Sequence, residues 1–223
     1  MNNKTIKNVV LWTTFVLIVV AGIVFKQPFI RMLPLLISLF IVLFQAEANR
    51  YSFIAGGANA LFYTYVYFQV GLYASAASAL FFSFPIQILT FISWKKHSYE
   101  KTTRFKKLSV KARVCICIGF VAVWLGVLKI LQLAGSGYAV LDNTASLLGV
   151  LVSVLTMMAY VEYSYLWLVS TSLAIILNIQ VTLNAPSHIP YVISTVYNMW
   201  CVVNAFKNVQ KLYKKQQAER VKD

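Results

Sequence analysis

The amino-acid sequence predicts an all-α integral membrane protein with about eight transmembrane helices. Of its 223 residues, 60% are hydrophobic and only 12% are charged. A soluble domain of this length could not bury so much apolar surface in one core, so the surplus is expected to face lipid. The apolar residues also fall into runs of about 20, the length that a helix needs to cross a bilayer.

Eight such runs follow one another along the chain. They cover residues 9–25, 29–48, 52–70, 74–94, 113–134, 142–161, 164–183 and 188–206. In the same order, the breaks between them are Lys26-Gln27-Pro28, Asn49-Arg50, Gly71, the basic loop 95–112, Gly135-Ser136-Gly137, Glu162 and the polar turn from Asn184 to Pro190. Glycine and proline favour turns and charged side chains favour the membrane surface, so each break is expected to end a helix.

The net charge of +14 is typical of a nucleic-acid-binding protein, but the positions of the basic residues argue against that function. They form short clusters between the apolar runs and are not interleaved with aromatic residues on a polar surface. Seventeen of the 20 Lys and Arg residues fall on one side of an eight-span arrangement and two on the other, while Lys129 lies within a span. By the positive-inside rule, the first side, which carries both termini, is cytoplasmic and faces an anionic leaflet.

The order of the spans indicates an internal repeat. Segments 52–94 and 164–206 are each a pair of helices that follows one further span and ends before basic residues. Three helices plus one connector restore the starting orientation, so the two repeats are predicted to be parallel, about an axis along the membrane normal. The predicted parts are an N-terminal tail with an extra helix (1–28), a first three-helix repeat (29–95), a basic loop with a connector helix (96–134), a second three-helix repeat (135–206) and a basic cytoplasmic tail (207–223).

The sequence lacks the groups that an intramembrane enzyme or an ion-driven pump uses. It has no GxxxxGK[ST] phosphate loop and no HExxH or GxSxG motif, and its three cysteines have no metal-ligand spacing. Glu47, Asp142 and Glu162 fall near span ends, so no carboxylate is expected near mid-membrane, where proton and sodium relays use one. We therefore expect no catalytic residue, no metal and no other cofactor.

Neutral polar and aromatic residues inside the spans are the candidates for substrate contacts. Three helical faces and one further position supply them: Asn59 and Tyr63; Phe84, Gln87 and Phe91; Ser164, Trp167 and Thr171; and Asn198. Aromatic rings offer flat faces for stacking and amides offer both a donor and an acceptor, so such a lining suits a neutral or weakly cationic ring-bearing molecule. The alternative is that the amides hold helices together while the aromatic residues pack or lie at the interface.

The stretch NRYSF, followed by GGANALFYTYVYFQVGLYASAASALFFSFPIQILTFISW, resembles the Pnu-type (PnuC-like) vitamin transporters, whose best-known members take up nicotinamide riboside. The second half of the chain agrees in Leu141-Asp142, Tyr160-Val161-Glu162 and Trp167, and the similarity covers about residues 30–206. The resemblance implies a fold like that of the SWEET-type sugar transporters, with two triplets around a connector. It also implies facilitated diffusion, a cytoplasmic kinase that traps the substrate by phosphorylation, and a homotrimer.

This chain departs from the family pattern at four positions. Trp167 matches the second Trp of the family's Trp-x-x-Trp pair, but the first is Ser164 here, and the Asn four residues after the second Trp is Thr171. Where members often have Gly-Trp, this chain has Thr90-Phe91. Because the family's Trp and Asn positions are associated with nicotinamide riboside recognition, a deoxynucleoside, thiamine or another ring-bearing vitamin is open as the substrate.

We interpret the chain as a passive transporter of a nucleoside or B-vitamin precursor in a bacterial inner membrane. Asn59 and Gln87 match polar positions of the family and are expected to read the polar edge of the substrate, while Trp167 is expected to stack on its ring. Two alternatives stay open. The chain could be a membrane scaffold or subunit whose polar residues only hold helices together, or a proton-coupled transporter, which would need a buried carboxylate.

Overall fold

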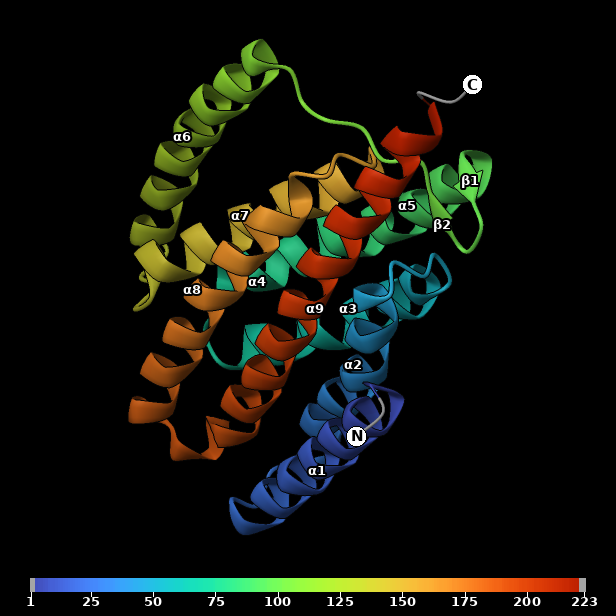
Figure 1. Ribbon diagram of the computed structural model, residues 1–223. Helices are drawn as coiled ribbons and strands as arrows, with labels where there is room; N and C mark the ends of the chain where they lie inside the picture. Colours follow the sequence, from blue (N-terminus) through green and yellow to red (C-terminus); the bar gives the residue numbers. More distant parts are fainter. Residues whose placement is uncertain (1–2, 221–223) are drawn as a thin grey trace.

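The computed structural model describes residues 3–220 and shows a bundle of long helices with one small hairpin (Figure 1). The elements are α1 (Asn3–Val24), α2 (Phe29–Ala46), α3 (Ser52–Gln69), α4 (Tyr73–Ser78), the π-helical turn η1 (Ala79–Ser83), α5 (Phe84–Lys96), β1 (Ser98–Tyr99), β2 (Thr102–Thr103), α6 (Val110–Leu133), α7 (Ala139–Met157), α8 (Tyr163–Asn184), the 3-10 turn η2 (Pro186–His188) and α9 (Ile189–Arg220). Residues 1–2 and 221–223 of the predicted terminal segments lie outside the described residues.

The predicted helices are confirmed to within a few residues at most ends. Because α4, η1 and α5 continue into one another, the described chain has eight long helices. Six of them are long and apolar enough to cross a membrane: α1, α2, the α4–α5 helix, α6, α7 and α8. The other two, α3 and α9, have about the predicted length or more but a more polar composition. Helix α3 packs against α2, α4 and α5 with one face and exposes apolar side chains such as Leu61 and Phe68 on another.

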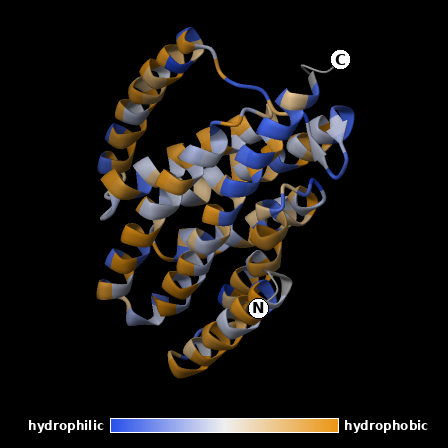
Figure 2. Ribbon diagram, viewed as in Figure 1, coloured by the Kyte–Doolittle hydropathy of each residue, from blue (hydrophilic) through white to orange (hydrophobic). Residues whose placement is uncertain are grey.

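The helices form two groups of three that are packed across each other. Helix α3 packs against α2 and the α4–α5 helix, and α8 packs against α7 and α9. The first helix of each group also packs against the last helix of the other group, so α2 contacts α9 and α7 contacts the α4–α5 helix. Helices α1 and α6 lie at the edges of the bundle and are strongly hydrophobic in Figure 2. Within the described chain, Leu131 is the only buried residue of α6.

Helices α2 and α7 end in the same turn. Ala48 (φ 53°) and Ala159 (φ 60°) both adopt the left-handed conformation two residues beyond the helix. In each turn the next N–H closes a six-residue loop, from Asn49 N to Phe44 O at 3.1 Å and from Tyr160 N to Leu155 O at 2.9 Å. This hydrogen bond satisfies a carbonyl at the helix end, as in a Schellman motif. Segments 44–53 and 155–164 therefore share their local conformation.

The loop between α5 and α6 is ordered, and its hairpin was not predicted from the sequence. Strands β1 and β2 pair antiparallel, and Phe105 beyond them is fully buried. Lys106 exchanges backbone hydrogen bonds with the chain that follows α7. Gln216 of α9 accepts from Phe105 N at 2.8 Å and donates to Thr103 O at 2.9 Å. We call this end of the molecule the hairpin end (residues 44–53, 96–109 and 157–163).

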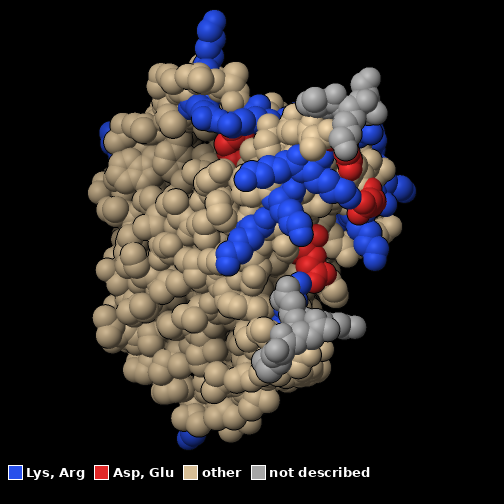
Figure 3. Space-filling view, viewed as in Figure 1, with Lys and Arg blue, Asp and Glu red and all other residues tan. Residues whose placement is uncertain are grey.

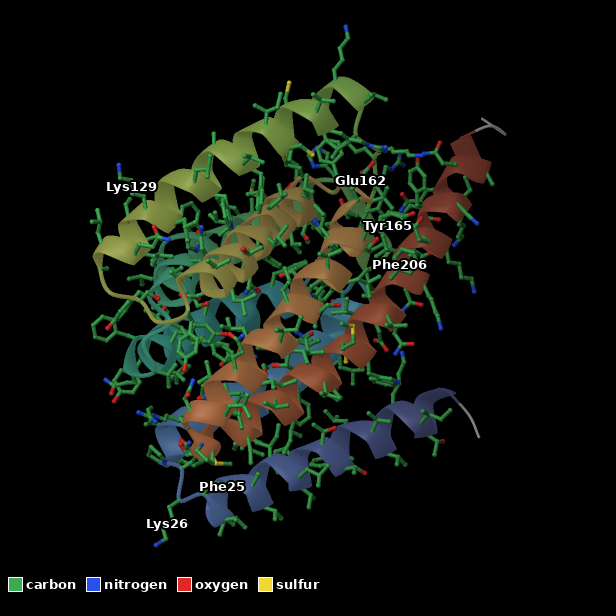
Figure 4. All side chains as sticks on the ribbon, turned by 90° about the vertical axis from the view of Figure 1, so that its left-hand side faces the viewer. Phe25, Lys26, Lys129, Glu162, Tyr165 and Phe206 are labelled. Atoms are coloured by element: carbon green, nitrogen blue, oxygen red, sulfur yellow. The ribbon has the colours of Figure 1, made fainter. Side chains whose placement is uncertain are left out.

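Basic residues gather around the hairpin end and the adjoining part of α9 (Figure 3). By contrast, Lys26 and Lys129 point away from the bundle at its other end (Figure 4). We call that end the opposite end (residues 24–28, 70–73, 134–138 and 185–188). The separation follows the grouping expected from the positions of Lys and Arg in the sequence.

Candidate functional site

A cavity of about 360 Å³ lies inside the bundle between α2, α3, the α4–α5 helix, α7 and α8. We call it the main chamber. A smaller cavity of about 210 Å³, the side chamber, lies between α2, α3, α8 and α9. Tyr63, Tyr67 and Asn178 line both chambers, so the two adjoin. Every residue that lines either chamber is uncharged.

Asn59 presents a hydrogen-bond acceptor to the main chamber. Its side chain is 4% exposed, and its Nδ2 donates to the main-chain oxygen of Pro34 at 3.0 Å. Because a carbonyl oxygen can only accept, this bond fixes which end of the amide faces away from Pro34. Among the described residues, Asn59 Oδ1 has no hydrogen-bond partner. A buried acceptor without a partner is costly, so a ligand or water that donates there is stabilised.

Gln87 reaches the main chamber because α3 carries glycine opposite it. A Cβ added to Gly56 would lie 1.9 Å from Gln87 Oε1, and one added to Gly57 would lie 3.2 Å from a methyl carbon of Ile88. The two glycines thus let α3 and the α4–α5 helix approach each other closely at this point. Gln45 Nε2 donates to Gln87 Oε1 over 3.4 Å, a long bond that leaves the amide free to bind a ligand.

The helix that carries Gln87 widens next to the chamber. In η1 the N–H of Phe84 bonds to Ala79 O, one residue further back than in an α-helix. Pro85 follows and has no N–H to donate to the preceding turn, which favours this local widening. Ser78, Ala79 and Ser83 line the main chamber here. The π-helical turn was not predicted from the sequence.

Aromatic side chains form much of the remaining wall. The rings of Tyr63 and Tyr67 stack with centroids 5.4 Å apart, and the hydroxyl of Tyr63 donates to Ser38 Oγ at 3.1 Å. Trp167 is half-buried on α8 and lines the main chamber, with Tyr163 one turn away at 6.4 Å between centroids. The chamber thus combines stacking surfaces with amide and hydroxyl groups.

The predicted site residues separate into two sets. Asn59, Tyr63, Gln87 and Trp167 line the main chamber, and Asn198 lines the side chamber. The four that line neither chamber are Phe84, Phe91, Ser164 and Thr171.

Those four residues lie close behind the lining or beside it. Phe91 packs against Tyr51, with ring centroids 5.9 Å apart. Ser164 is fully buried and donates to the main-chain oxygen of Val161 at 2.8 Å, and Thr171 is also buried on α8.

Asp142 is the feature of this region that sequence reasoning missed. It is fully buried in the first turn of α7 and accepts hydrogen bonds from Ala74 N at 3.0 Å, from Ser75 N at 3.2 Å and from the Ser75 hydroxyl. Ser75 and Ser146, which also bonds to the carboxylate, line the main chamber. The carboxylate therefore ties α7 to the start of α4 at the opposite end. Its position at the end of a predicted span does not reveal its partners Ala74 and Ser75, which lie 67–68 residues away in the sequence.

The same two helices are also tied together at the hairpin end. Trp94 Nε1 donates to Thr156 O at 2.8 Å and Ser93 Oγ donates to Met157 O at 3.0 Å. The ring of Trp94 is fully buried between Phe53, at 4.9 Å, and Phe105, at 5.8 Å. The main chamber and η1 lie between these contacts and Asp142, so the α4–α5 helix is attached to α7 on both sides of the cavity.

A polar cluster lies behind the wall of the side chamber near the opposite end. His188 stacks on Tyr191 with centroids 4.2 Å apart and shares a hydrogen bond of 2.8 Å with Asn178 Oδ1. Burial and, in second place, the positive charge of Arg31 together lower the pKa of His188 to about 4. The imidazole is therefore neutral at pH 7, with its Nε2–H donated to Asn178.

A third cavity, of about 570 Å³, lies outside the bundle between α1, α2 and α3. It is lined mainly by apolar side chains such as Phe15, Leu36 and Phe40 and is open to the surface. An apolar groove on the lipid-facing side of a membrane protein is filled by acyl chains, so we do not assign it to the substrate. Within the described residues, no group of three His, Cys, Asp or Glu side chains is placed to hold a metal ion.

Comparisons with known proteins agree with this architecture. Residues 28–210 match the family described as nicotinamide mononucleotide transporter. The fold is similar to that in "Crystal structure of the Vitamin B3 transporter PnuC", with a TM-score of 0.81 over 97% of this chain and 94% of that one. The two sequences are 20% identical, so this likeness speaks for the fold. A search of curated proteins found no match.

Proposed function

Because the chain belongs to the nicotinamide mononucleotide transporter family, of the PnuC type, we propose that it is a passive carrier of a ring-bearing nucleoside, with nicotinamide riboside as the first candidate. The family is one of transporters, so the chain is not an enzyme. The observation that carries the proposal is the main chamber, a cavity between the helices of the bundle with aromatic and neutral polar walls. Such a lining complements a ring with polar substituents.

The uncharged lining favours a nucleoside over a nucleotide. A phosphate monoester carries about −1.5 to −2 charges at neutral pH and needs cationic partners when it leaves water. Neither chamber has Lys, Arg or His in its wall. We therefore propose that this chain transports the riboside, although the family is described by the mononucleotide. A phosphorylated product could not re-enter the chamber, which explains how a cytoplasmic kinase would trap the substrate.

Within the site, we assign roles by position. Trp167 stacks on the ring of the substrate, and Asn59 and Gln87 bind its polar edge. Asn59 offers an acceptor, so it suits a donor such as a carboxamide N–H₂. Phe84, Phe91, Ser164 and Thr171 act indirectly, by packing next to or behind the wall. Deoxynucleosides and thiamine remain alternative substrates for the same chamber.

We propose facilitated diffusion rather than proton coupling. Asp142 is the buried carboxylate among the described residues, and both of its oxygens accept hydrogen bonds that attach α4 to α7. That arrangement suits a structural contact better than a relay, which needs a path for the proton. Attachment of the α4–α5 helix to α7 at both ends, with η1 between, suits a carrier that opens one end at a time.

We also propose the membrane orientation and the assembly. The basic hairpin end, and with it both termini, faces the cytoplasm of a bacterial inner membrane. Segments 29–95 and 135–206 are parallel three-helix repeats joined by the connector α6, which is supported by the shared turns at Ala48 and Ala159 and by the crossed packing of the two groups. As the resemblance implies, the working unit is a homotrimer.

Binding measurements on the purified protein test the substrate site. Trp167→Ala should weaken binding of nicotinamide riboside about tenfold, because aromatic stacking adds roughly 0.5–1.5 kcal/mol beyond the burial that is also lost. Trp12→Ala is the matched control, since Trp12 is 55% exposed on α1. Equal affinities for the Trp167 variant, the control and the wild type would show that the pocket lies elsewhere. The polar residues would then only hold helices together, as in a scaffold protein.

A further inference from the structure

The open cavity of about 570 Å³ between α1, α2 and α3 has one apolar and one polar end. We call it the outer groove. The residues that α1 and α2 contribute to its lining are all apolar, whereas Asn49, Tyr51 and Ser52 line it where α2 ends and α3 begins, at the hairpin end. We propose that the outer groove binds an anionic phospholipid, with an acyl chain along its apolar part and the phosphate at Arg50.

The apolar part of the groove has nearly the length of one membrane leaflet. It follows α2 from Leu36 to Phe44 and includes Phe15 of α1. Eight residues of α-helix rise about 12 Å, and half of the hydrocarbon core of a bilayer is about 15 Å thick. The groove therefore suits an acyl chain of the leaflet whose headgroups lie at the hairpin end.

The polar end offers hydrogen-bond donors to a headgroup. Asn49 Oδ1 accepts from Tyr51 N at 3.1 Å, so the N–H₂ of the Asn49 amide is left to donate. The side chain of Tyr51 is 56% exposed and carries a hydroxyl that can donate as well. Phosphate and ester oxygens are acceptors, so this end of the groove complements the phosphoglycerol part of a lipid.

Arg50 lies beside this polar end and has unmet donors. Its guanidinium carbon is 5.3 Å from the centroid of the Tyr51 ring. The side chain is half-buried, and among the described residues its buried Nε and Nη1 donate to no acceptor. Unmet donors of a charged group are costly away from water, and the planar fork of a guanidinium matches a phosphate.

No carboxylate among the described residues neutralises Arg50. The ion pairs there join Glu47 to Lys7, Glu100 to Lys215 and Glu162 to Arg113. The positive charge of Arg50 is therefore left for an anion from outside the chain.

The surroundings of Arg50 favour an anionic headgroup over a zwitterionic one. Phe91 of α5 packs against Tyr51, with ring centroids 5.9 Å apart, and Lys95 follows one turn later on the same helix. Further basic residues gather at this end of the molecule (Figure 3). A zwitterionic headgroup would bring an ammonium group into this positive field, whereas a headgroup with net negative charge is attracted.

Native mass spectrometry of the full chain in detergent, with equal amounts of phosphatidylglycerol and phosphatidylethanolamine, tests the site. The wild type should retain the anionic lipid over the zwitterionic one by about tenfold, as expected for a charge-assisted contact. Arg50→Gln should reduce that preference to about twofold, and Arg50→Lys should keep most of it. The matched control is Lys211→Gln, which removes one exposed positive charge on α9 outside the groove and should keep the wild-type preference. Ala55→Trp fills the groove from the exposed side of α3 and should reduce retention of both lipids severalfold.

Four results overturn the lipid site. They are a wild type that retains neither lipid, an Arg50→Gln variant that keeps the full preference, an equal loss of preference in Lys211→Gln, and an Ala55→Trp variant that retains both lipids as the wild type does. The same spectra report the oligomeric state. If Ala55→Trp separates an oligomer into monomers and leaves lipid retention unchanged, the groove is an interface between copies of this chain. Should Arg50→Gln show no cooperative thermal unfolding, Ala55→Trp decides the question with the same outcomes.

Discussion

Removal of the Asp142 carboxylate should destabilise the protein strongly, although the residue touches no substrate. In Asp142→Ala, the N–H groups of Ala74 and Ser75 lose their acceptor inside the bundle, whereas the Ser75 hydroxyl can turn to Ser146 Oγ at 3.0 Å. Each buried donor left unpaired costs about 1–3 kcal/mol, so the free energy of unfolding should fall by roughly 2–6 kcal/mol. For a chain of this size, 1 kcal/mol corresponds to about 2–4 °C in Tm. The expected loss is therefore on the order of 10 °C.

Thermal unfolding followed by tryptophan fluorescence in detergent measures this loss. The matched control is Glu47→Ala, which removes a carboxylate whose ion pair with Lys7 spans 2.7 Å at the surface, with side chains 45% and 21% exposed. Such pairs contribute about 0–1 kcal/mol, so the control should shift Tm by less than about 3 °C. Asp142→Asn keeps one acceptor oxygen and should fall between the two. If Asp142→Ala unfolds within a degree of the wild type, the attachment of α4 to α7 through this carboxylate is refuted.

Three further outcomes are expected. Gly56→Ala should push the Gln87 amide out of the chamber and weaken substrate binding severalfold. Gly57→Ala, whose Cβ would lie 3.2 Å from a methyl carbon of Ile88 and 3.5 Å from the main-chain oxygen of Phe84, should bind nearly as the wild type does. Equal binding by both variants would contradict the role of Gln87. His188 has a folded-state pKa of about 4 against 6.5 when unfolded, so the unfolded chain binds more protons in that window and stability should fall as pH drops from 6.5 to 4. The stability should fall by at most about 1.4 kcal/mol per pH unit, and this contribution should be absent in His188→Gln. If the wild type and His188→Gln show the same dependence of stability on pH, the assignment to His188 is contradicted. A cysteine introduced at Ser98, in a background whose native cysteines are replaced, should resist a membrane-impermeant thiol reagent in intact cells, and ready labelling from outside would reverse the proposed orientation.

Local signals predicted most of the helices, because the glycine, proline and charged residues that end a helix can be recognised in the sequence. Gly71, with φ 75°, makes the short turn between α3 and α4 that the sequence marked with a single glycine. The turns at Ala48 and Ala159 were harder to foresee, since alanine seldom adopts a positive φ. The hairpin was missed because its conformation depends on long-range partners. Gln216 holds the loop of Phe105 from more than 100 residues away.

The candidate site was predicted in part for the same reason. Helical spacing correctly grouped Asn59 with Tyr63 on one lining face, because residues four apart share a face in any α-helix. Spacing cannot say how a helix is rotated against its neighbours. Ser164 is three residues before Trp167, yet Ser164 is buried against Val161 and Gln210 while Trp167 faces the chamber. The partners of Asp142 lie on a helix that no local pattern connects with α7.

Transport in proteoliposomes that contain only this protein tests the central claim most directly. The claim is that an uncharged chamber carries the nucleoside downhill and excludes its phosphate ester. With no ion gradient and no ATP, labelled nicotinamide riboside should enter until the inside and outside concentrations are equal, and nicotinamide mononucleotide should not enter. Entry of the mononucleotide at a comparable rate, or accumulation of the riboside above the outside concentration when a proton gradient is imposed, would contradict the account.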